Sequence, residues 1–181
     1  KKTYHKYFKQ VQGVPVYFGT KEVEYDGRTL RFLELTLQNG EDSNKISVPL
    51  KNKGGYTDEV RKLVSVLNGA DLNEEIVFSM RNNKYTNKRG VEKEDLQIYG
   101  NYVNRKNEEG RGESTGFIPY DEIPQPIQKT VAGDVVWDWT PQTEFYYQKI
   151  QEIEERFKNK DEPTPAKKET KKKEAAVVGD D

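Results

Sequence analysis

The chain has 181 residues and is nearly neutral, with 30 Lys and Arg residues against 31 Asp and Glu residues, so only local charge can indicate a nucleic-acid partner. With no Cys residue and a single His residue, it excludes disulfide frameworks, thiol nucleophiles, thiolate zinc sites and His-dependent triads. No apolar run approaches the roughly 20 residues of a membrane-spanning helix, and the start lacks a signal-peptide core, so we expect a soluble, intracellular protein with one folded core.

Three β-strands are predicted in the first 50 residues, because apolar side chains alternate with polar ones at the period of a strand. Asp26-Gly27 and Asn39-Gly40 supply turns. Tyr17 and Phe32 alternate with the apolar residues of their strands and are therefore expected to face outward. The predicted inward-facing residues are Val14, Val16 and Phe18, then Leu33, Leu35 and Leu37, then Ile46, Val48 and Leu50.

A helix is predicted within residues 56–68, where apolar residues recur at helical spacing, with Thr57 as the N-cap and Asn68-Gly69 as the stop signal. Two further strands follow, joined by a long hairpin. The apolar residues that mark these elements are Val60, Leu63, Val64 and Leu67 in the helix, Ile76, Phe78 and Met80 in the fourth strand, and Leu96 and Ile98 in the fifth.

The order of three strands, one helix and two strands is that of the OB-fold. We therefore predict a mainly β protein whose residues 10–103 form a five-stranded OB-fold barrel with one helix between strands three and four. A generic α+β sheet is the competing interpretation. The barrel is preferred because the helix falls where it would plug the open end of a barrel, and because no repeated βαβ rhythm indicates a parallel sheet.

The rest of the chain divides by composition. Residues 1–9 form a basic-aromatic N-terminal arm, and residues 104–116 are glycine-rich and charged, as expected of a flexible loop. Residues 117–158 are predicted to be an extension with a C-terminal helix, whose inner face carries Phe145, Ile150, Ile153 and Phe157. Residues 159–181 are predicted to be a disordered charged tail, because they have too few apolar groups to fold.

A basic-aromatic cluster occupies the hairpin between the fourth and fifth predicted strands. From Arg81 to Lys93, five basic residues stand against the single acidic residue Glu92, with Tyr85 among them. An OB barrel binds extended strands across strands two and three and at the loops that join strands one to two and four to five. The predicted DNA-binding residues are Tyr17, Arg28, Arg31, Phe32, Arg81, Lys84, Tyr85, Lys88, Arg89, Tyr99, Arg105 and Lys106.

Two alternatives stay open for these residues. The basic hairpin is also compatible with a solvated charged tip, and an outward aromatic such as Phe32 with a second small core under the C-terminal extension. Catalysis finds no support, because the chain contains no Walker loop, dinucleotide fingerprint or HExxH motif, and His5 has no ligand-type residue beside it that would complete a site. We expect no enzymatic activity, no catalytic residue, no metal and no cofactor.

With the segments Val77–Arg81, Leu96–Gly100 and Phe117–Asp138, the chain resembles the OB-fold single-stranded DNA-binding proteins of tailed bacteriophages. This resemblance implies a protein that coats and protects single-stranded DNA during phage replication and recombination, in the host cytoplasm. It also implies a tail that binds replication or recombination proteins, here Val177, Val178, Gly179, Asp180 and Asp181. The tail departs from the acidic tails of many members because it contains five lysines between residues 167 and 173.

Two other functions remain open. An RNA-binding OB module would prefer RNA over DNA strands of the same length. A structural or adaptor protein would use the barrel and the C-terminal helix for protein contacts. The sequence indicates neither an oligomeric state nor the length of strand that one protein covers.

Overall fold

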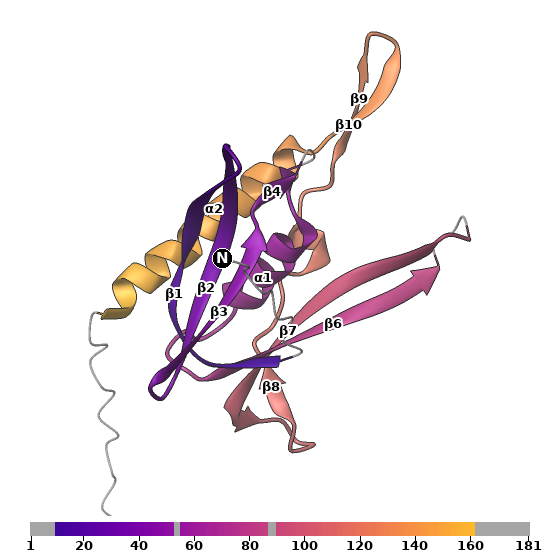
Figure 1. The fold of residues 1–181 in the computed structure, drawn as a ribbon. Coiled ribbons are helices and arrows are strands. Elements are labelled where there is room, and N and C mark those ends of the chain that lie inside the picture. The colour runs from indigo at the N-terminus through magenta and orange to yellow at the C-terminus, as the bar shows by residue number, and fades with distance from the viewer. Residues whose placement is uncertain (1–9, 53–54, 87–89, 162–181) are drawn as a thin grey trace, which may run out of the picture.

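The computed structural model describes residues 10–52, 55–86 and 90–161, which form a mainly β structure with one large antiparallel sheet and a helix at the C-terminal side (Figure 1). The strands of the large sheet lie in the order β3-β2-β1-β6-β7-β8. Their bounds are Gln10–Tyr25 for β1, Arg28–Asn39 for β2, Asp42–Pro49 for β3, Ile76–Thr86 for β6, Glu92–Lys106 for β7 and Gly112–Ser114 for β8.

The smaller elements flank this sheet. Two short strand pairs form sheets of their own. The described residues also contain two α-helices and two 3-10 helices. Their bounds are Lys51–Asn52 for β4, Gly55–Tyr56 for β5, Ile127–Val131 for β9, Asp134–Asp138 for β10, Asp58–Asn68 for α1, Thr140–Lys158 for α2, Tyr120–Glu122 for η1 and Asn159–Asp161 for η2. None of the described helices is both long and apolar enough to cross a membrane.

Strand β1 changes partner along its length. Residues 10–13 pair with β6, and the residues from Val14 onward pair with β2. Gly13 lies at the change, where a Cβ atom would sit 2.7 Å from the backbone oxygen of Gln38, so only glycine fits without a shift of the backbone. This close approach lets one strand belong to both halves of the sheet.

A register shift follows between Pro15 and Tyr17. As a result Val16 and Tyr17 are both exposed, while Pro15 and Phe18 are buried. The predicted inward position of Val16 is therefore wrong, because a bulge adds a residue to one strand and breaks the alternation of faces. The predictions for Phe18 and for the leucines of β2 are confirmed.

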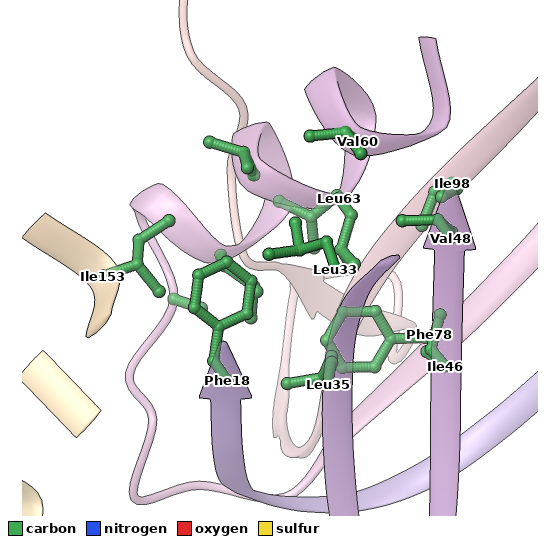
Figure 2. Close-up of a cluster of buried hydrophobic side chains, with 14 of the residues drawn as sticks. Phe18, Leu33, Leu35, Ile46, Val48, Val60, Leu63, Phe78, Ile98 and Ile153 are labelled. Carbon is green, nitrogen blue, oxygen red and sulfur yellow. The ribbon is translucent and has the colours of Figure 1, made fainter. Parts of the chain in front are cut away.

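The core lies between one face of the sheet and the two α-helices (Figure 2). Thr57 caps α1 by accepting a hydrogen bond from the Val60 backbone N–H at 3.3 Å, which confirms the predicted start. Figure 2 shows how side chains from several strands, α1 and α2 meet there. The residues labelled are Phe18, Leu33, Leu35, Ile46, Val48, Val60, Leu63, Phe78, Ile98 and Ile153.

Helix α2 packs on the end of the core. Phe157 stacks on Phe18 with ring centroids 5.8 Å apart, and Ile153 is buried. The Arg156 guanidinium donates hydrogen bonds to the backbone oxygens of Leu67 and Asn68, both at 3.0 Å, and also to that of Ala70. The Arg156 side chain thus ties helix α2 to backbone oxygens at and just past the C-terminal end of α1.

Several expectations need correction. The large sheet has six strands and is not closed within the described residues, so the predicted five-stranded barrel is not confirmed. The segment predicted as a loop, residues 104–116, contains the end of β7 and all of β8. The β9–β10 hairpin was not predicted, and it extends away from the sheet and the helices (Figure 1). The chain also continues as η2 past residue 158, where the tail was expected to begin.

Candidate nucleic-acid interface

Strand register sorts the side chains of β6 and β7 onto two faces. Phe78 and Met80 point into the core, so Ser79, Arg81, Asn83 and Tyr85 lie on the opposite face, which we call the outer face. Their cross-strand partners on β7 belong to the same face. These partners are Tyr99 opposite Ser79, Gln97 opposite Arg81, Asp95 opposite Asn83 and Lys93 opposite Tyr85.

Tyr99 forms an aromatic pair on this face. Its ring meets that of Phe117 edge to face, with centroids 6.2 Å apart, and about half of Phe117 is exposed. Arg81 is a diagonal neighbour of Tyr99 across the strand pair, within reach of a long side chain. Phe117 was missing from the predicted site, although an apolar residue after Gly116 in a polar stretch was a usable signal.

The outer face of β6–β7 therefore offers two aromatic positions with cations beside them. Tyr85 is 52% exposed near the far end of the hairpin, opposite Lys93. Arg81 lies between Tyr85 and the Tyr99–Phe117 pair. Aromatic faces for bases and cations for phosphates, alternating along an exposed strand pair, are the groups that bind single-stranded nucleic acid.

Two predicted cations are engaged elsewhere. Lys84 lies on the core-side face of the hairpin, where its ammonium is 3.0 Å from Glu94. Arg105 donates to Glu74 at 2.6 Å and to Asp71 at 2.9 Å. The hydrogen bond from Arg105 to Glu74 raises the pKa of Arg105 above its ordinary value, so this guanidinium stays charged within a network of the protein.

A second outer-face region lies on β1, β2 and β3. Tyr17, Phe32 and Arg28 share this face, while Arg31 lies on the other face and forms an ion pair with Glu22 at 2.6 Å. Tyr17 is about half exposed and Phe32 is partly buried. Lys21 was not among the predicted residues, and it stands directly opposite Phe32 on β2.

Some predicted residues lie outside the described residues. These are Lys88 and Arg89, the arm formed by residues 1–9, and the proposed partner-binding residues 177–181. Lys106 is described and exposed, opposite Gly112.

No family model, curated protein or solved structure matches this chain. An inference about function therefore rests on the chain's own residues. Across the described ranges, no group of three or more His, Asp or Glu side chains is arranged to hold a metal ion. Two acids of the β6–β7 hairpin point to different faces, where Glu94 pairs with Lys84 and Asp95 pairs with Lys62.

The β9–β10 hairpin, which we call the hairpin arm, presents apolar side chains to solvent. Trp137 is 58% exposed, and Trp139 follows at the start of α2. The Lys129 ammonium is 2.5 Å from a carboxylate oxygen of Asp138. The hairpin arm thus combines large apolar groups with a cation that is already paired, unlike the outer face of β6–β7. Its other exposed apolar residues are Ile127, Val131, Val135 and Val136.

The base of the hairpin arm is predicted to respond to acid. The hydrogen bond from Lys129, and then those from Thr140, hold the pKa of Asp138 well below its usual range. The pKa of Asp138 is lower in the folded protein than in the unfolded chain, where it is about 4. The ionised carboxylate therefore stabilises the fold above about pH 4, and this contribution is lost as the pH falls through the folded pKa. We expect the carboxyl ¹³C shift of Asp138 to show an ionised group at about pH 3.

Lys129→Ala provides the control, because it removes the largest cause of the shift. The variant should move the titration midpoint of Asp138 toward about 4. A midpoint near 4 in the unsubstituted protein would contradict the prediction.

Proposed function

We propose that the chain is a non-enzymatic, largely sequence-independent single-stranded DNA-binding protein, which coats displaced strands during phage replication and recombination in the host cytoplasm. The observation that carries the proposal is the outer face of β6–β7, where Arg81, Tyr85, Lys93 and the Tyr99–Phe117 pair share one side of an exposed hairpin. A stacked base contributes roughly 1–3 kcal/mol, so two such positions suffice for useful affinity.

The topology supports the same proposal. The long strands β3, β2, β1, β6 and β7 follow the order of an OB barrel whose last seam is open, and α1 falls between the third and fourth of them along the chain. We propose that the sheet is a five-stranded barrel of this type. Its expected binding surface then comprises β2, β3 and the β1–β2 and β6–β7 hairpins.

The test is fluorescence anisotropy with a labelled oligo(dT) across a range of salt concentrations, with duplex DNA and oligo(U) as competitors. We expect preferential binding of the DNA single strand. The affinity should fall with salt, with a log–log slope of about −0.7 for each phosphate contacted. Equal or tighter binding of oligo(U) would favour an RNA-binding module instead.

A second candidate function is that of an adaptor that binds other proteins, and the hairpin arm favours it. Exposed apolar groups that project from a protein typically mark interaction sites, and the hairpin arm carries Trp137 with several exposed valines. If the protein is an adaptor, we expect it to bind no nucleic acid even at low salt, where electrostatic binding would be strongest. That result would exclude DNA binding and leave the hairpin arm as the leading functional surface.

A further inference from the structure

One buried acid lies at the centre of the outer face formed by β1, β2 and β3. The register places Glu34 of β2 between Gly19 of β1 and Ser47 of β3. These three residues form one row across the strands. Two further rows lie on the same face, one on each side, and each is two residues away along the strands. The first flanking row is Lys21, Phe32 and Pro49, and the second is Tyr17, Thr36 and Lys45.

Lys21 and Lys45 thus occupy diagonal corners around Glu34, and both side chains turn toward it. The Lys45 ammonium is 3.1 Å from one carboxylate oxygen of Glu34, and the Lys21 ammonium is 3.8 Å from the other. The side chain of Glu34 is only 10% exposed, whereas those of the lysines are 53% and 54% exposed. The carboxylate therefore holds both ammonium groups over one point of the face while they still contact solvent.

The charges of this cluster do not balance. Two ammonium groups share a single carboxylate, which leaves one unit of positive charge among the three side chains. Each ammonium has three N–H donors, so the pair has donors to spare after binding Glu34. Tyr17 and Phe32 lie on the same face and supply aromatic rings beside these donors. An anionic group next to a flat ring fits this surface better than any neutral ligand.

We propose that Lys21 and Lys45 bind the phosphate backbone of a single strand whose bases contact Tyr17 and Phe32, with Glu34 as the residue that positions both lysines. This inference rests on the proposed function, and it names two cations that sequence analysis missed. Ordering by Glu34 lowers the conformational entropy that two free lysine side chains would lose on binding.

The test compares salt dependence in the full-length chain, with oligo(dT) as the probe. Lys21→Ala with Lys45→Ala should make the log–log slope shallower by about 0.7 for each phosphate that the variant no longer binds, hence by roughly 1.4 for the pair. The same relation predicts a loss of affinity of roughly 65-fold at 50 mM salt and little loss at 1 M. Lys21→Arg with Lys45→Arg should keep the slope.

Lys129→Ala with Lys149→Ala is the matched control. Each of these lysines pairs with one carboxylate away from the outer face, on the hairpin arm and on α2, so the change in net charge is the same. The control should leave the slope unchanged. An equal loss of affinity and slope in the control would overturn the proposal, because the change in net charge alone would then explain the effect.

Removal of both lysines leaves the buried Glu34 carboxylate unpaired, which could destabilise the fold. A second variant therefore separates loss of DNA contacts from loss of stability. Lys21→Gln, Glu34→Gln and Lys45→Gln together remove the acid as well and should show the same shallower slope. A wild-type slope in this variant would overturn the role of the lysines while DNA binding stands. Absence of any single-strand binding by the unsubstituted protein would instead overturn the proposed function and this inference with it.

Discussion

Replacing Tyr99 and Phe117 together with alanine is expected to weaken single-strand binding by about 1–3 kcal/mol, which is roughly 5- to 160-fold in dissociation constant. The two rings form one edge-to-face pair on the outer face of β6–β7. Their removal takes away a stacking surface and leaves the neighbouring cation Arg81 in place. The affinity should therefore fall at every salt concentration, with little change in the log–log slope.

Two controls separate stacking from stability. Tyr99→Phe keeps the ring and should keep the affinity, whereas Tyr147→Ala removes an exposed aromatic from α2 and should have no effect. Thermal unfolding should show that the double variant remains folded. Wild-type affinity in a folded double variant would remove this pair from the binding site.

Arg156→Met is expected to lower the free energy of unfolding by about 3 kcal/mol, because hydrogen bonds to charged groups contribute roughly 1.5–3 kcal/mol each and neighbouring ones are not additive. The guanidinium donates to three backbone oxygens at the end of α1, where the partial negative charge of the helix also favours a cation. Methionine keeps most of the aliphatic side chain, so the variant isolates the polar interaction.

Denaturant unfolding followed by circular dichroism measures this effect. Lys158→Met, on the exposed side of the same helix, is the matched control and should change the stability by less than about 0.5 kcal/mol. A change of that small size in Arg156→Met would show that α2 is held to the core by its apolar contacts alone.

The sequence predicted the elements well wherever one regular period ran through them. The helix that begins after Thr57, the leucines of β2 and the pair of strands after Ile76 all follow this pattern. The hairpin arm was missed because its apolar residues have no buried face, so their alternation carried no information about a core.

The candidate site was harder to predict than the fold. The alternation of faces along β6 correctly separates Tyr85 from the core. Lys84 was predicted for the same site because it precedes Tyr85 in the sequence, but neighbouring residues of a strand point to opposite faces. The bulge after Pro15 moved Val16 to the surface, which no count of residues could reveal. Lys21 and Lys45 are distant in the sequence, and only the pairing of three strands brings both to Glu34.

The hairpin arm forms a sheet of its own, and two strands alone are only marginally stable in water. It should therefore open and close without unfolding the core, and its backbone amides should exchange with deuterium far faster than those around Phe78. A ligand that binds only the closed hairpin arm would lose part of its binding free energy to closing the arm, so its apparent affinity and the rise in melting temperature would be smaller than at a rigid site. Slower deuterium uptake at Trp137 and its neighbours would report such binding directly.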